Sequence, residues 1–201
     1  RVSPSEDARW IKRSLKLLEN SWAYHPRDPL IVDMVFQIAH NYYTLSGKVV
    51  LSESFPDLFR QVVEFLLESD AGQLSSIGRI SAGRMILFYI RNLKKTEEKE
   101  KYLDLIIHLC SLNEEQRDLL WDFQYSESFA VLGLAYSERV KQKDNSLSRN
   151  EKREYLTKAI ECFDQVLSVK TVYAPSDLNL RNQTKSYLES LEMEWARSDE
   201  K

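Results

Sequence analysis

Apolar residues recur at intervals of three and four along almost the whole chain, and this periodicity constrains the fold most. Ile11, Leu15, Leu18 and Trp22 form one such stripe near the N-terminus. The spacing puts side chains on one face of an α-helix, whereas a half-buried strand needs strict alternation, which no segment sustains. Only five glycines and five prolines occur in 201 residues, which disfavours a turn-rich β architecture. The sequence therefore predicts an all-α fold.

Helix-start signals divide the chain into about eight helices. Pro4, Pro29 and Thr96 each stand where an apolar stripe begins, at positions typical of a cap or a first turn. Asp28 is a candidate cap before Pro29, and Asn113 and Gln116 form a candidate capping pair. The small-residue segment 69–83 and the polar segment 142–150 are interpreted as connections, and the second predicts a flexible loop. The expected helices span about residues 4–24, 29–46, 55–68, 80–93, 97–110, 114–141, 151–170 and 178–197.

The second expected helix is apolar on two faces. Ile31, Met34 and Ile38 share one face, whereas Val32 and Val35 lie on another. A helix of this kind is packed on both sides.

The order of the helices predicts how they are arranged. Consecutive helices joined by short links pack antiparallel, so the pattern predicts four successive pairs starting near residues 4, 56, 97 and 151. Stacked pairs form an α-solenoid, here as a single helical-repeat domain of residues 1–201. A closed helical bundle is the alternative.

One stretch resembles a known repeat family. Its first helix carries a bulky residue, then Leu-Gly, then Tyr, at Phe129, Leu132, Gly133 and Tyr136. After a loop, its second helix carries a small, an aromatic and an aliphatic residue, at Ala159, Phe163 and Val166. This pattern is similar to the tetratricopeptide repeat. The link between its two helices is longer than the family's tight turn, and the expected proline appears only at Pro175. The resemblance implies a tetratricopeptide-like half, residues 112–201, with a C-terminal capping helix. Residues 1–111 look more like a HEAT or armadillo array.

The resemblance also implies where helices touch and where a partner binds. Gly133 and Ala159 would let two helices approach closely, with Phe163 filling the space around them. The first helix of the matched pair would line a groove for the partner through Glu127, Ala130, Leu134 and Ser137.

A basic stripe on the fourth expected helix is the second candidate binding surface. Arg84, Arg91 and Lys95 share one flank of that helix beside Phe88. Such a stripe can dock an acidic peptide or a phosphate, or it can be an ordinary solvated face. If the stripe is a docking surface, replacing both Arg84 and Arg91 by Glu should weaken the complex with the partner and leave the stability of the chain unchanged.

No pattern of a catalytic or metal site is present in the sequence. Residues 78–85 have the glycine spacing of a P-loop, but Arg84 and Met85 stand where that loop needs Lys and a hydroxyl. His25, His40 and His108 are far apart, and neither a nucleophile elbow nor a dinucleotide fingerprint occurs. We therefore expect no catalytic residue, no metal ligand and no cofactor.

Net charge and composition reduce the number of partner classes that the sequence allows. A net charge of −3 gives no global attraction to nucleic acid, and no apolar run is long enough for a membrane span. Cys110 and Cys162 lie among apolar residues, as reduced core thiols of an intracellular protein do, which predicts a cytoplasmic or nuclear location. Because the chain begins with Arg1, we expect it to be a domain of a longer protein.

These features together favour a non-catalytic protein–protein interaction domain. A scaffold or adaptor of this kind would bind a helix or an extended peptide of another protein, including an acidic one, in a solenoid groove. A helical enzyme or enzyme-regulatory domain is the alternative, and it would require a deep pocket with converging polar groups. Nucleic-acid binding through the basic stripe is a weaker alternative, and it predicts a steep dependence on salt.

Overall fold

The chain is described by a computed structural model over residues 4–46, 55–69, 73–90, 96–118, 120, 122–142, 146–169 and 175–199. These residues form nine α-helices and no strand, which confirms the all-α prediction. The helices are α1 (Pro4–Tyr24), α2 (Pro29–Ser46), α3 (Phe55–Glu68), α4 (Ser76–Ile90), α5 (Thr96–Cys110), α6 (Glu114–Asp118), α7 (Asp122–Lys141), α8 (Arg149–Ser168) and α9 (Pro175–Asp199).

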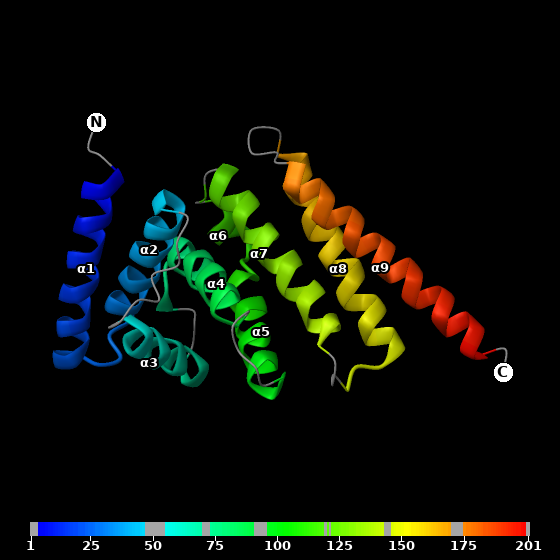
Figure 1. Ribbon diagram of the computed structural model, residues 1–201, viewed down its shortest axis with the longest axis horizontal. Coiled ribbons are helices and arrows are strands. Elements are labelled where there is room, and N and C mark those ends of the chain that lie inside the picture. The colour runs from blue at the N-terminus through cyan, green and yellow to red at the C-terminus, as the bar shows by residue number, and fades with distance from the viewer. Residues whose placement is uncertain are drawn as a thin grey trace.

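The helices follow one another in an elongated row, with α1 at one end and α9 at the other (Figure 1). Within the row, α7, α8 and α9 alternate in direction. Along the row, α2 packs on α1 and α4, α5 packs on α4 and α7, and α8 lies between α7 and α9. The sequence predicted α3 as the partner of α4, but α2 is the main neighbour of α4 on that side, and α3 packs against α5 and α1.

One cluster of buried apolar residues runs through most of the row, from Leu15 on α1 to Val166 on α8. The Val32 and Val35 face of α2 is fully buried in this cluster, as predicted. The opposite face is covered only in part, because Ile31 is buried but Met34 is exposed. None of the described helices is long and apolar enough to cross a membrane. The division of the chain near residue 111 stays a prediction.

Side-chain caps position several helix starts as the sequence predicts. Asp28 Oδ1 accepts a hydrogen bond from the Leu30 N–H at 2.9 Å, at the start of α2. Asn113 and Gln116 bond reciprocally to each other's backbone N–H groups at 2.8 and 3.0 Å. These bonds satisfy N–H groups that have no partner within the first turn of a helix.

Several helix boundaries differ from the predicted ones, including the division into α6 and α7 and the start of α8. The long helix expected from Glu114 is divided, because the Leu120 N–H bonds to the Arg117 carbonyl three residues earlier, at 2.9 Å, and so closes a tight turn after α6. α8 begins at Arg149, inside the segment predicted to be a loop. Ser148 and Glu151 form a complete capping box there, which fixes the start of the helix. Of the segment 142–150, residues 143–145 lie outside the described residues.

The close helix contact that the repeat resemblance implies is present. A Cβ atom placed on Gly133 of α7 would lie 3.0 Å from Phe163 Cε1 and 3.2 Å from the Ala159 carbonyl oxygen, both on α8. The absence of a side chain at Gly133 lets the two helices approach this closely without displacing the Phe163 ring. A second close approach occurs at Gly83 of α4, whose Cβ would lie 2.6 Å from Cys110 Sγ.

Candidate functional site

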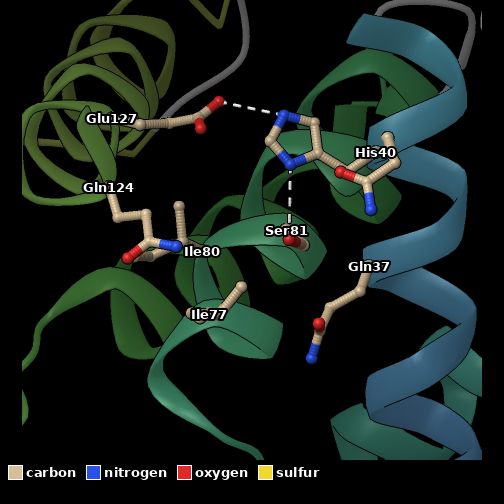
Figure 2. Close-up of a pocket in the computed structure, with 8 residues that line it drawn as sticks. Gln37, His40, Ile77, Ile80, Ser81, Gln124 and Glu127 are labelled. Carbon is tan, nitrogen blue, oxygen red and sulfur yellow. Dashed lines mark hydrogen bonds and ion pairs between the residues drawn. The ribbon is translucent and has the colours of Figure 1, made fainter. Parts of the chain in front are cut away.

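A polar pocket of about 130 Å³ opens between α2, α4 and α7 (Figure 2). Most of its lining side chains carry an amide, a hydroxyl, an imidazole or a carboxylate, in a region where the neighbouring helices are packed through apolar residues. The lining residues are Gln37, His40, Asn41, Ile77, Ile80, Ser81, Gln124 and Glu127. Convergence of polar groups from three helices on one pocket is the feature that most distinguishes this face of the molecule.

A buried carboxylate lies at the centre of the contacts in this pocket. The Glu127 side chain is 8% exposed, and its Oε1 lies 3.1 Å from His40 Nε2 and 3.2 Å from Arg84 Nε. His40 Nδ1 lies 3.3 Å from Ser81 Oγ, so the imidazole bridges α7 and α4 from its place on α2 (Figure 2). With the ring proton on Nε2, His40 Nδ1 accepts a hydrogen bond from the Ser81 hydroxyl. A buried charge needs such partners, because burial without them costs several kcal/mol.

A polar ridge on α2 directs His40 toward α4. Asp33, Gln37 and His40 are spaced by four and three residues, which places them on one face of the helix. Gln37 Nε2 donates to Asp33 Oδ2 at 2.6 Å, and His40 continues the ridge one turn further. The ridge faces Ser75 and Ser81 at the start of α4.

The carboxylate of Asp33 caps the N-terminus of α4. Its Oδ1 accepts the Ser75 N–H at 3.1 Å, and Ser75 Oγ lies 2.9 Å from both carboxylate oxygens. Ser75 Oγ in turn accepts the Gly78 N–H at 3.0 Å. A negative charge is favourable at this end of a helix. This cap explains why α4 begins at Ser76 rather than near Ile80.

The P-loop-like glycine spacing has a packing explanation. A Cβ atom on Gly78 would lie 1.5 Å from Asp33 Oδ1, so Gly78 makes room for the capping carboxylate. Gly83 makes room for Cys110, as described above. Arg79 is buried between them and donates to the carbonyls of Leu109 and His108 at 2.9 and 2.8 Å, which satisfies the C-terminal end of α5. The place where an anion would sit at this helix start is taken by Asp33.

The structure brings together two residues that the sequence assigned to separate surfaces. Arg84 was expected on a basic stripe and Glu127 in a groove, and they form one ion pair. The Arg84 guanidinium also lies over the ring of half-buried Phe88, 5.7 Å from its centroid. Arg91 and Lys95 lie outside the described residues. The charge of Arg84 is therefore balanced within the chain.

The other α7 residues predicted to line a groove lie mostly in the interior. Ala130 and Ser137 are buried, and Leu134 is half-buried and packs on the core. The sequence also predicts that the aromatic run Trp121, Phe123, Tyr125 and Phe129 lies mostly in the core, with one or two exposed anchors. In the structure, Phe129 is buried and Tyr125 is half-buried against it. Trp121 and the side chain of Phe123 lie outside the described residues. Glu127 is thus the member of the predicted groove set that borders the pocket.

Several pocket residues were missed by the sequence analysis. His40, Gln37 and Asn41 belong to a helix that the sequence marks as apolar on two faces, and Ser81 lies in the segment interpreted as a connection. A signal for the first group was available: polar residues at a spacing of four and three within an otherwise apolar helix indicate a polar contact inside the packed layer.

The ion pair between Arg84 and Glu127 changes what a charge reversal at residue 84 should do. Arg84→Glu would place a second carboxylate beside the buried carboxylate of Glu127. We expect the free energy of unfolding to fall by about 2 kcal/mol. The effect is moderate because the Arg84 side chain is 26% exposed, so solvent screens part of the repulsion. Thermal unfolding measures this as a loss of about 4–8 °C. Arg84→Gln should lose less, because it removes attraction without adding repulsion. An unchanged melting temperature for Arg84→Glu would show that the pair contributes nothing.

Neither cysteine has the environment of a nucleophile. Cys110 and Cys162 are free thiols, and burial raises the pKa of each to about 12. At neutral pH both therefore remain protonated, whereas the thiolate is the reactive form. Among the described residues, no three His, Cys, Asp or Glu side chains are grouped closely enough to hold a metal ion.

Comparison with known proteins finds no match for this chain among protein-family models, curated proteins or solved structures. The resemblance to tetratricopeptide and HEAT or armadillo repeats therefore stays a prediction, with which the row of helices and the contact of Gly133 with Ala159 and Phe163 are compatible.

Proposed function

We propose that the chain is a non-catalytic interaction domain, built as an α-solenoid, that binds an extended segment of a partner protein across α2, α4 and α7. The observation that carries this proposal is the polar pocket between these helices, with exposed Asn41 and Ile77 at its edge. A row of stacked helices offers a long continuous surface of the kind on which repeat domains bind peptides.

The size of the pocket favours one side chain of a larger ligand. Small-molecule and cofactor sites usually enclose roughly 300–1,000 Å³, whereas this pocket has about 130 Å³. A peptide that places one side chain in the pocket would lay its backbone across the helices on either side. Binding energy would then be spread over the surface, as is usual for extended peptides.

The chemistry of the lining residues indicates what the peptide offers. Exposed Asn41 presents a donor and an acceptor, which match the C=O and N–H of a peptide group. Ile77 offers an apolar contact beside it. Because Arg84 already balances the charge of Glu127, an uncharged polar side chain fits the pocket better than a charged one, which would leave an unbalanced buried charge.

Selection from a random peptide library tests this proposal. Wild-type protein should enrich peptides that share one pattern, and Asn41→Ala/Ile77→Ser should bind those peptides about tenfold or more weakly, because it removes one hydrogen bond and one apolar contact. Asn182→Ala/Met193→Ser is the matched control, since it makes the same kinds of change at exposed residues of α9. No enrichment by the wild type, or equal losses in both variants, would contradict a peptide site on this face.

A second candidate function rests on the chain of contacts from Ser81 through His40 to Glu127. In acyl-transfer enzymes a serine, a histidine and a carboxylate are connected in this order, and N–H donors stabilise the oxyanion. Ser81 is buried within α4, where the backbone N–H groups that follow it bond to the preceding turn of the helix. The site thus has the three side chains but lacks free N–H donors beside the serine, so we favour the binding domain.

A fluorophosphonate probe that labels activated serines separates the two functions. We expect no labelling of the wild-type protein. Labelling that disappears in Ser81→Ala would favour a hydrolase-type enzyme and contradict the non-catalytic assignment.

A further inference from the structure

An apolar groove of about 440 Å³ is lined by residues of α1 and α2. These two helices lie at the N-terminal end of the row (Figure 1). At this groove, the face of α2 that carries Ile31, Met34 and Ile38 is covered only in part. The apolar lining of the groove consists of Leu17, Leu18, Leu30, Ile31, Met34 and Ile38, and none of the described residues that line it is acidic. Met34 is exposed although the sequence marks its face of α2 as one that packs, and Leu30 beside it is exposed as well.

The α1 side of the groove has the pattern of a helix-binding edge. Trp10, Ser14, Leu17, Ser21 and Tyr24 are spaced by four, three, four and three residues, which is the spacing of a coiled-coil seam. The three large residues of this edge are 62%, 66% and 82% exposed, respectively. Three large apolar residues in line along one helix edge form a continuous surface rather than isolated exposed side chains.

The two serines of the edge allow a close approach by another helix. Ser14 Oγ donates to the Trp10 carbonyl at 3.1 Å, and Ser21 Oγ donates to the Leu17 carbonyl at 3.0 Å. Because each hydroxyl is bonded to its own helix, covering it leaves no donor without a partner. Small residues between large ones create the recesses into which a partner's side chains fit.

The charges beside this edge indicate which charge the partner helix should carry. Arg9 and Arg13 are exposed on the outer flank of α1, and the Arg13 guanidinium lies 5.3 Å from the centroid of the Trp10 ring. Glu19 is bound to Lys16 at 2.6 Å on another face of the helix. Among the described side chains of α1, the flank next to the groove is therefore basic, and a docking helix gains from carboxylates placed beside Arg9 and Arg13.

We infer that the groove between α1 and α2 binds an amphipathic helix of a partner protein, with apolar residues at a three–four spacing and acidic residues along one flank. This surface is separate from the α2–α4–α7 pocket and takes a helix instead of an extended segment. A second copy of the chain fits less well. Antiparallel pairing of two α1 helices about Leu17 would bring Arg13 opposite Ser21 and Arg9 opposite His25, so neither arginine meets a carboxylate.

A library of helical peptides tests the inference. The peptides carry Leu, Ile, Met or Phe at a three–four spacing, and their flanking positions are randomised among Glu, Lys and Gln. Wild-type protein should enrich peptides with Glu on one flank. Leu17→Gln should weaken their binding about tenfold or more. Arg9→Glu/Arg13→Glu should shift the enriched flank from Glu to Lys, a reversal that unfolding of the variant does not produce.

Control variants and further measurements distinguish the remaining outcomes. Met193→Gln, which changes an exposed apolar residue of α9, should bind as the wild type does, and Asn41→Ala/Ile77→Ser should keep helix binding even if it loses extended peptides. No preference between flanks, or no effect of Leu17→Gln, overturns the inference. Binding to phosphatidylserine vesicles without selection of any peptide assigns the groove to a membrane surface. A dimer seen in sedimentation that Leu17→Gln dissociates assigns the groove to a second copy.

Discussion

Gly78→Ala should lower the free energy of unfolding by about 3 kcal/mol, although alanine is a better helix former than glycine. The intrinsic gain is at most about 1 kcal/mol. Against it, the new Cβ would lie 1.5 Å from Asp33 Oδ1, so the buried carboxylate has to leave its place at the start of α4. Asp33 would then lose its bonds to Ser75 and Gln37, and charge-assisted bonds of this kind contribute about 1.5–3 kcal/mol each. Thermal unfolding should show a loss of about 6–12 °C.

A double-mutant cycle identifies the cause of that loss. Asp33→Ala removes the carboxylate and should itself destabilise the protein, because the start of α4 loses its cap. In that background, Gly78→Ala has no carboxylate to displace and should be neutral or stabilising. If Gly78→Ala costs as much with Asp33→Ala as without it, the packing proposed for the start of α4 is wrong.

Gly133→Leu should lower the free energy of unfolding by about 3 kcal/mol, at the upper end of what overpacking usually costs. The first atom of the new side chain would already lie 3.0 Å from the Phe163 ring and 3.2 Å from the Ala159 carbonyl oxygen. The remaining atoms of leucine have no space unless α7 and α8 move apart. Among the described helices this pair has the most extensive contact, so we expect a loss of about 6–12 °C in the melting temperature.

Two companion variants show whether Phe163 is the obstacle. Gly133→Ala should change stability little, because a slight shift of the ring is offset by the better helix propensity of alanine. Phe163→Ala should cost about 3–5 kcal/mol alone, but adding Gly133→Leu to it should cost less than in the wild type, since part of the ring volume is free. A melting temperature of Gly133→Leu equal to that of the wild type would contradict the close contact of α7 and α8.

The helices themselves could be predicted because their signals are local. The Asp28 and Asn113 caps, the break after Tyr24 and the small residue Gly133 in a helix contact depend on residues near one another in sequence or on a recognisable repeat pattern. The start of α8 was also marked locally, by Ser148 and Glu151, but the polar composition of the segment favoured a loop.

The start of α4 and the polar pocket depend on contacts between distant residues. Asp33, which caps α4, is 42 residues away from Ser75, so its effect does not appear in the local pattern of residues 69–83. The same holds for Glu127, which meets His40 from α2 and Arg84 from α4 only after these helices have packed. From sequence alone, Arg84 and Glu127 were two separate surface residues, because spacing along one helix does not reveal which charge faces it from another.

The binding site proposed on α2, α4 and α7 can be tested most directly by photocrosslinking. A photoreactive phenylalanine analogue is placed at Asn41, beside the pocket, and in a second protein at Asn182 on α9, both exposed positions. The probe is a peptide enriched by the wild-type protein from the random library. We expect a covalent adduct from position 41 and only background from position 182, with excess unlabelled peptide competing for the first. Equal yields from both positions, or an adduct from position 182 alone, would contradict the account.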